Sequence, residues 1–136
     1  MAPRYLLDTN ICIYIRRHRP PKVLTQFLQL QPGEAVLSVI TYGELMYGIA
    51  KRQPAPPKAV AQLDEFLSLV GVMPLPTEAG QKYGEIRCFL ESKGQMIGNN
   101  DLWIAAHAIS SGLTVITNNE REFRRVPDLK IENWTK

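Results

Sequence analysis

Apolar residues in this chain alternate between short continuous runs and longer stretches in which they recur every three or four positions. A short run is typical of a buried strand, whereas the longer spacing is typical of a helix with one apolar face. The short runs predict strands, the last of them at an edge of the sheet, at 5–7, 35–40, 72–75, 113–116 and 130–134.

The longer stretches predict helices, whose ends are set by capping residues and breakers. We expect Thr9 or Asn10 to cap the first helix, Thr41 to open the third and Thr77 to cap the fifth. The predicted helices span 11–17, 21–30, 41–52, 58–70, 77–93, 102–111 and 120–125. Strands that alternate with helices predict an α/β fold with a central parallel sheet flanked by helices on both faces.

Length and composition are typical of one intracellular domain. The 136 residues can bury a core without disulfides, and the proline-rich connection at 53–57 is too short for a domain linker, so we expect a single domain over 1–136. No apolar run approaches membrane-spanning length, which predicts a cytoplasmic protein without membrane contact. Cys12 and Cys88 lack metal or redox spacing, and we expect both to be reduced residues of the core.

Positive charge is clustered at two places in a chain whose net charge is +3. One cluster contains Arg16, Arg17, His18, Arg19 and Lys22, and the other contains Arg121, Arg124 and Arg125. Such clusters are either solvated charges at helix ends or contacts for the phosphates of a nucleic acid. Around an acidic, metal-binding centre they would suit a nuclease.

Three acids stand where a predicted strand passes into a predicted helix. Asp8 follows the first strand, Glu44 lies in the first turn of the helix after the second, and Asp101 opens the helix that follows the polar loop at 98–100. In an open parallel sheet such junctions meet at one edge, where the acids can share a metal ion. Carboxylates in one crevice repel one another unless a cation lies among them, which predicts Mg²⁺ or Mn²⁺ and chemistry by metal-activated water.

Each of these acids also has a purely structural explanation. Asp8 can be a helix N-cap. Thr41 and Glu44 match a capping box, in which the glutamate bonds back to the N-cap amide. Asp101 opens a helix, where the macrodipole favours negative charge and either of the two preceding asparagines can cap. Taken one at a time, the acids leave both explanations open.

The loop after the fourth strand offers weaker candidates. Asn119 could hydrogen-bond a metal-bound water or ligate through its amide oxygen, but it adds no charge, and Glu120 and Glu122 follow it. We expect His107 to be packed or hydrogen-bonded and His18 to lie at the surface. The sequence has no serine or cysteine triad spacing, no phosphate-binding glycine loop and no zinc cluster.

Two other functions fit the same acids. A phosphatase of the haloacid-dehalogenase type also places an aspartate after its first strand, but it needs a second aspartate two residues later, where this chain has Asn10. An RNA-binding module without catalysis would use the acids only as helix caps.

Four blocks of the sequence carry a family resemblance that covers essentially the whole chain. The blocks are LLDTN at 6–10, SVITYGEL at 38–45, IGNNDLWIAAHA at 97–108 and TNNEREFRRVPDLKIENW at 117–134. In this order they resemble the signature blocks of the PIN-domain family and, more closely, those of its VapC toxins from bacterial toxin–antitoxin pairs.

The resemblance implies an Mg²⁺-dependent or Mn²⁺-dependent endoribonuclease, usually a homodimer, that is silenced by a cognate VapB antitoxin. The family's acidic metal ligands fall on Asp8, Glu44 and Asp101 of this sequence. Its fourth, often acidic, position falls near Asn119, with Glu120 and Glu122 as possible substitutes. The closest resemblance is to the enteric type, which implies cleavage of initiator tRNA in the anticodon stem-loop and inhibition of translation.

Overall fold

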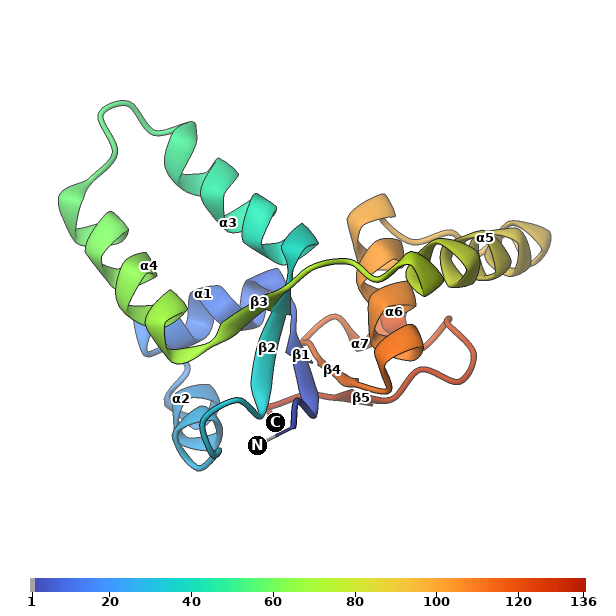
Figure 1. The fold of residues 1–136 in the computed structure, drawn as a ribbon, viewed down its shortest axis with the longest axis horizontal. Helices are drawn as coiled ribbons and strands as arrows, with labels where there is room; N and C mark the ends of the chain where they lie inside the picture. The colour runs from blue at the N-terminus through green and yellow to red at the C-terminus, as the bar shows by residue number, and fades with distance from the viewer. Residues whose placement is uncertain (1) are drawn as a thin grey trace.

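A five-stranded sheet forms the centre of the computed structural model, which describes residues 2–136 (Figure 1). Its strands lie in the order β3-β2-β1-β4-β5, and every neighbouring pair is parallel. The strands are β1 (Tyr5–Leu7), β2 (Ala35–Ser38), β3 (Gly71–Met73), β4 (Thr114–Ile116) and β5 (Ile131–Glu132). The chain extends the sheet from β1 in one direction and then from β1 in the other, so the strand order reverses between β1 and β4, where such sheets form a crevice.

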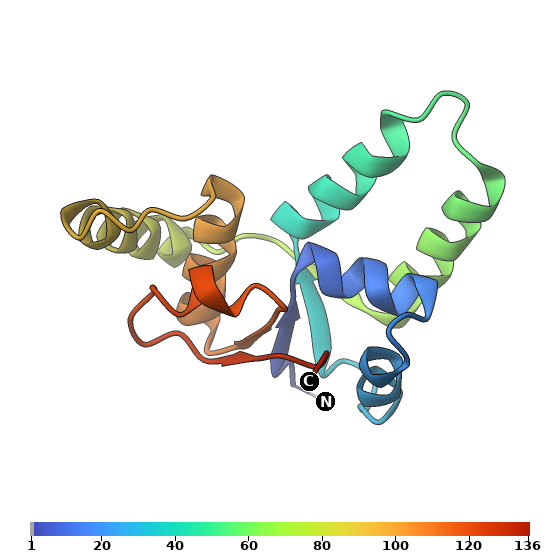
Figure 2. The ribbon, with the colours of Figure 1, turned by 180° about the vertical axis from the view of Figure 1, so that it is seen from behind.

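Helices cover both faces of this sheet (Figures 1 and 2). They are α1 (Thr9–Arg17), α2 (Pro21–Leu28), α3 (Val39–Ala50), α4 (Pro57–Leu69), α5 (Thr77–Ser92), α6 (Asn99–Ser111) and α7 (Glu120–Phe123). The predicted α/β fold, with a parallel sheet between helices, is confirmed. Among residues 2–136, no helix is both long and apolar enough to cross a membrane.

Alternation along the strands divides the core into two apolar layers. Leu6 packs into the layer that includes α5 and α6, whereas Leu7 packs into the layer that includes α1, α2 and α4. Val115 and Ile116 of β4 divide between the layers in the same way. Successive side chains of a strand point to opposite faces, so a short, wholly apolar strand serves both layers.

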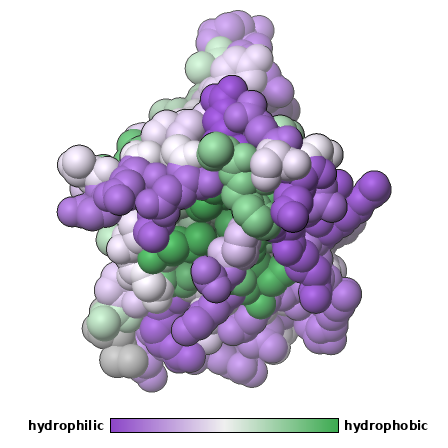
Figure 3. Space-filling view, turned by 90° about the vertical axis from the view of Figure 1, so that its right-hand side faces the viewer, coloured by the Kyte–Doolittle hydropathy of each residue, from purple (hydrophilic) through white to green (hydrophobic). Residues whose placement is uncertain are grey.

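Two parts of the molecule extend away from the sheet. In both ribbon views α3 and α4 project together on one side, and α5 extends with the loop that follows it on the other (Figures 1 and 2). At the α5 end, hydrophobic residues lie at the centre of the surface, with hydrophilic residues around them (Figure 3). Phe89 of α5 and Met96 of the following loop are among the exposed large apolar side chains.

Several predicted boundaries are wrong, and at the start of α3 a capping hydrogen bond gives the reason. The Ser38 hydroxyl accepts a hydrogen bond from the Ile40 amide at 3.1 Å, so β2 ends and α3 begins before Thr41. The helix α6 begins at Asn99, earlier than predicted, with Gly98 at its N-cap and no side-chain cap. Similarly, Pro76 rather than Thr77 is the N-cap of α5. The strands β2, β3 and β5 are all shorter than the apolar runs that predicted them.

The cysteine and histidine predictions have mixed outcomes. Cys12 is buried as predicted, but Cys88 is exposed on α5, so its placement in the core is wrong. His18 is exposed at the end of α1, and His107 is buried, as predicted. The His107 Nδ1 atom lies 2.9 Å from the Ser38 hydroxyl, which ties α6 to the start of α3.

Replacing Ser38 by alanine should lower the free energy of unfolding by about 2–4 kcal/mol. The change removes the cap of α3, worth about 1 kcal/mol. It also removes the hydrogen-bond partner of His107 Nδ1. The other nitrogen of this buried ring, Nε2, has no partner among the described residues, so the loss should cost about 1–3 kcal/mol more, the usual penalty for an unpaired buried polar group. Urea unfolding measures the difference.

The matched control is Ser68→Ala on α4, where the hydroxyl donates to the Glu65 carbonyl at the exposed surface. That change should alter the free energy of unfolding by less than about 0.5 kcal/mol. Equal losses for the two serine variants would contradict the role assigned to Ser38.

Candidate active site

Asp8 lies at the carboxyl end of β1, beside the point where the strand order reverses. Its side chain is 5% exposed and caps α1, because Oδ1 accepts a hydrogen bond from the Ile11 amide at 2.9 Å. The prediction that Thr9 or Asn10 would cap this helix is therefore wrong. Burial raises the pKa of Asp8 and the nearby Glu44 raises it further, whereas the hydrogen bonds from Thr117 and Ile11 lower it.

Thr117 lies in the loop that offered weaker candidates, but the sequence predicted no role for it. It follows β4, is fully buried, and donates its hydroxyl hydrogen to Asp8 Oδ2. The same hydroxyl accepts from the Asn119 amide at 2.9 Å. A hydroxyl residue directly after a buried strand that neighbours β1 is the signal that could have identified it. Each oxygen of the Asp8 carboxylate thus has a fixed donor.

Glu44 reaches the same region from α3. Its Oε1 accepts a hydrogen bond from the Thr9 hydroxyl at 2.6 Å, which ties the helix α3 to the residue that follows Asp8. The capping-box alternative for Glu44 is wrong, because Ser38 rather than Thr41 caps α3 and Glu44 lies one turn further along. The side chain is half-buried and keeps Oε2 for another partner.

Asp101 lies in the first turn of α6, opposite Glu44. The two acids line one open crevice together with Gly98, Asn99 and Asn100. The pKa of Asp101 is raised to about 6, first by burial and then by the negative charges of Glu122, Asp8 and Glu44. Asp101 therefore lies near Glu122 of α7, Asp8 at the end of β1 and Glu44 of α3.

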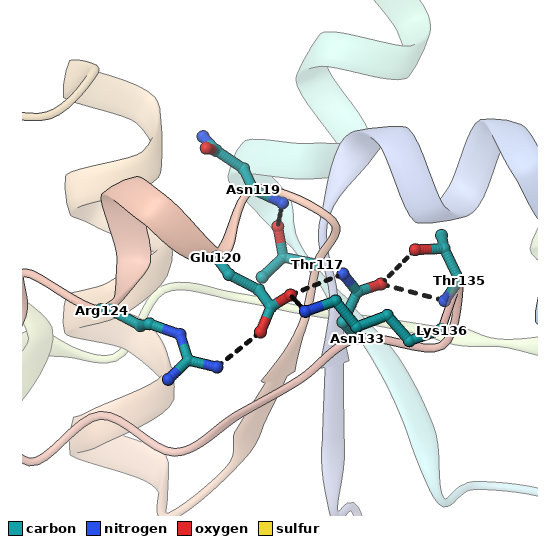
Figure 4. A network of polar contacts seen from close by, with 7 residues as sticks. All are labelled: Thr117, Asn119, Glu120, Arg124, Asn133, Thr135 and Lys136. Atoms are coloured by element: carbon teal, nitrogen blue, oxygen red, sulfur yellow. Dashed lines mark hydrogen bonds and ion pairs between the residues drawn. The ribbon is translucent and has the colours of Figure 1, made fainter.

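Glu122 and Glu120 stand on the same short helix but face different surroundings. Glu122 is the carboxylate with the largest effect on Asp101, and its Oε2 accepts a hydrogen bond from the Asn119 side chain. Glu120 instead bonds Arg124, Lys136 and Asn133, which hold its pKa at about 2 (Figure 4). Of the two substitutes suggested by the sequence, the structure brings only Glu122 beside Asp101.

Asn119 contacts Thr117 and Glu122, and neither of its contacts is with Asp8, Glu44 or Asp101. Its backbone amide donates to the Thr117 hydroxyl oxygen (Figure 4). Its side-chain amide donates to Glu122, so Asn119 supports one residue that bonds Asp8 and one that lies beside Asp101. The metal-ligand roles of Asp8, Glu44 and Asp101, and a catalytic role of Asn119, stay predictions. The structure brings the acids together and gives Asn119 a supporting position.

The chemistry of this donor set suits a hard divalent cation. Carboxylate oxygens are the ligands that Mg²⁺ and Mn²⁺ prefer. Burial and then the charges of nearby carboxylates raise the pKa of Asp101, and a bound cation would offset both effects. Among residues 2–136, no three histidine, cysteine, aspartate or glutamate side chains are close enough to enclose an ion as they lie. An open crevice of this kind leaves room for water molecules in the coordination shell.

The basic clusters are only partly available to a ligand. Arg124 pairs with Glu120 at 2.6 Å, and Arg125 donates to the Met96 carbonyl at 2.9 Å. The cluster at 16–19 lies at the far end of α1 from Asp8, about 13 Å along the helix axis. Phosphate contacts by either cluster stay a prediction.

A family model and the most similar known sequences point to the same protein family. The family model of the PIN domain matches residues 5–129. The chain is 41% identical to Ribonuclease VapC2 of Haemophilus influenzae over 131 residues, which covers 96% of this chain and 98% of that protein. It is 40% identical, over the same shares, to the tRNA(fMet)-specific endonuclease VapC of Salmonella typhimurium.

A solved structure with a similar fold and sequence comes from the same family. The crystal structure of VapBC2 from Rickettsia felis, bound to a DNA fragment from its promoter, contains a chain that superposes with a TM-score of 0.88. The identity is 40%, and the superposition covers 96% of this chain and 98% of that one.

In metal-free protein, Asp101→Asn should raise the free energy of unfolding at pH 7 by about 1 kcal/mol, after allowing for solvent screening. The folded chain holds the Asp101 pKa at about 6, above its ordinary value of 3.8. As pH rises through this window the unfolded chain loses the proton first, so the wild type loses stability there. The variant should lack that part of the pH dependence.

Unfolding by urea between pH 4 and pH 7, with a chelator present, measures this difference. Asp64→Asn on the exposed face of α4 is the matched control and should leave the pH profile of the wild type unchanged. An Asp101→Asn profile parallel to that of the wild type would refute the mutual repulsion of the acids.

Proposed function

Because this chain belongs to the PIN-domain family and, within it, to the VapC proteins, we propose that it is a toxin ribonuclease whose activity depends on a divalent metal ion. The observation that carries the proposal is the setting of Asp101, which lines a crevice with Glu44 and whose pKa is raised to about 6 by burial and by the charges of Glu122, Asp8 and Glu44. Such a site is suited to binding a cation.

Asp8 and Asp101 would hold Mg²⁺ or Mn²⁺ directly or through water. Glu44 either ligates the ion or orients the attacking water, and Glu122 is the fourth acid of the set. When bound, the ion lowers the pKa of a water molecule and neutralises charge on the phosphate. In-line attack on the phosphodiester would leave a 5′-phosphate and a 3′-hydroxyl.

The residues around the acids keep the carboxylates oriented. Thr117 and the Ile11 amide each bond one oxygen of Asp8, Thr9 bonds one oxygen of Glu44, and Asn119 bonds one oxygen of Glu122. A carboxylate oxygen has two lone pairs, so each keeps acceptor capacity toward the crevice. Side chains held in this way lose little entropy when they take up an ion.

We propose tRNA as the substrate class, with initiator tRNA cut in the anticodon stem-loop and translation inhibited as a result. The support is the Salmonella relative, which is named a tRNA(fMet)-specific endonuclease and is 40% identical over nearly the whole chain. The phosphatase alternative has no such support, and its second aspartate is Asn10 here.

The proposed partners are a VapB-type antitoxin and a second copy of the chain. The first is supported by structural relatives that are VapBC complexes. The second is supported by apolar side chains at the surface of α3, where Met46 is 40% exposed and Tyr47 is 66% exposed. Large exposed apolar side chains on one element are typical of a surface that another protein covers.

Total bacterial tRNA incubated with the purified, antitoxin-free chain tests the main proposal. We expect a discrete cut that requires Mg²⁺ or Mn²⁺, is lost with a chelator, and falls at least about a hundredfold in Asp8→Asn and in Asp101→Asn. Mapping the ends names the substrate and the position of the cut. A folded wild type that binds tRNA but cuts no RNA with either metal would instead support a non-catalytic binding module.

Glu122→Gln and Glu120→Gln form a matched pair two residues apart on α7. Glu122→Gln should lower the cleavage rate at least about tenfold, because it removes the negative charge that acts most strongly on Asp101, and should weaken Mg²⁺ binding. Glu120→Gln should leave the rate within about twofold, because Glu120 bonds Arg124, Lys136 and Asn133 outside the crevice. Metal titrations of the cleavage rate measure both effects, and a reversed order would exclude Glu122 from the site.

A further inference from the structure

Beside the acids, the helices α5 and α6 pack together through two aromatic side chains. The rings of Tyr83 and Trp103 stack with centroids 3.9 Å apart and planes 17° apart. Arg87, one turn along α5, donates to the Tyr83 hydroxyl oxygen at 3.0 Å. The stack and the arginine together fix the position of the Tyr83 hydroxyl group at the surface of the molecule.

The Tyr83 hydroxyl in turn orients Asn99. Because its oxygen accepts from Arg87, the hydroxyl donates its own hydrogen to Asn99 Oδ1, at 2.6 Å. The acceptor end of the Asn99 amide is therefore engaged with Tyr83. Its Nδ2 group keeps two hydrogens, and Asn99 is exposed where it lines the crevice with Glu44 and Asp101.

A neutral hydrogen-bond donor at this position would help a phosphate to bind beside the acids. The acidic side chains of the crevice offer only acceptor oxygens when ionised, and an RNA phosphate also offers only acceptors. A phosphate that enters the crevice would meet repulsion from the carboxylates and would gain no hydrogen bond from them. The Asn99 amide adds donors at this wall of the crevice without adding charge that would compete with a cation.

We propose that Asn99 is a substrate-binding residue that donates to a phosphate oxygen of the RNA beside the scissile bond, and that Tyr83 is a positioning residue that orients it. The inference rests on the proposed ribonuclease function and deepens it. Tyr83 acts only through Asn99, so its hydroxyl matters for substrate binding while Asn99 is present and loses its effect once Asn99 is removed.

A double-mutant cycle on tRNA cleavage tests this coupling. Asn99→Ala should raise KM about tenfold with kcat changed less than about twofold, because a hydrogen bond to a charged group is lost outside the reacting atoms. Tyr83→Phe keeps the stacked ring and should raise KM about threefold. The double variant should match Asn99→Ala, because Tyr83 has no other route to the substrate.

Two controls remove similar groups nearby. Gln95→Ala takes an exposed amide from the loop before α6, and Ser92→Ala takes a hydroxyl from the end of α5. Both should leave KM within about twofold. Asn99→Asp, which replaces the donor by an acceptor of equal size, should raise KM more than Asn99→Ala and guards against an effect of lost volume.

Binding of tRNA to the Asp8→Asn background separates this inference from the proposed function. Suppose that the wild type cuts RNA. If Asn99→Ala leaves KM unchanged, or if the effects of Tyr83→Phe and Asn99→Ala on KM multiply in the double variant, the inference is overturned and the proposed ribonuclease function stands. Suppose instead that the wild type cuts no RNA. If Asn99→Ala lowers tRNA affinity about tenfold and Tyr83→Phe has no further effect in the Asn99→Ala variant, the positioning role stands and the proposed ribonuclease function is overturned. Unchanged affinity in that case overturns both.

Discussion

The carboxylates of Asp8, Glu44, Asp101 and Glu122 carry like charge, and the fold holds them at one edge of the sheet against their mutual repulsion. Two features of the fold offset part of this cost. Asp8 caps α1 and Asp101 lies in the first turn of α6, so each faces the positive end of a helix dipole. The parallel strands and their two apolar layers stabilise the rest of the arrangement, because strands of one direction end together.

Hydroxyl and amide donors on neighbouring elements set the directions of these acids. Thr117 after β4 bonds Asp8, Thr9 at the start of α1 bonds Glu44, and Asn119 before α7 bonds Glu122. Each donor is neutral, so it fixes a carboxylate without neutralising it. A lysine or arginine in the same places would have cancelled the charge that suits the crevice to a cation. The neutral donors therefore keep the site both ordered and acidic.

The sequence predicted the fold and the meeting place of the acids because both follow from short-range patterns. Buried strands followed by helices imply a parallel sheet, and the junctions then imply one edge. The side chains of Glu120 and Glu122 lie roughly 200° apart around α7. Glu120 bonds the neighbouring Arg124 but also the distant Asn133 and Lys136, and these distant contacts could not be read from the sequence. The predicted cap of α3 was wrong for a similar reason. Ser38 and Thr41 are both good caps, and His107, far along the chain, bonds the first.

For the proposed ribonuclease, the same repulsion links substrate binding to ion binding. A phosphate approaching Asp8 and Asp101 meets less negative potential once a cation neutralises them, so RNA binds more tightly to the loaded site. Linkage requires the reverse in equal measure, which means that bound RNA raises the affinity for the ion by the same factor. The Asn99 amide is uncharged, so it takes no part in this coupling between RNA binding and ion binding. Its contribution to RNA affinity should therefore persist when the ion is absent, which separates recognition of the RNA from assembly of the catalytic centre.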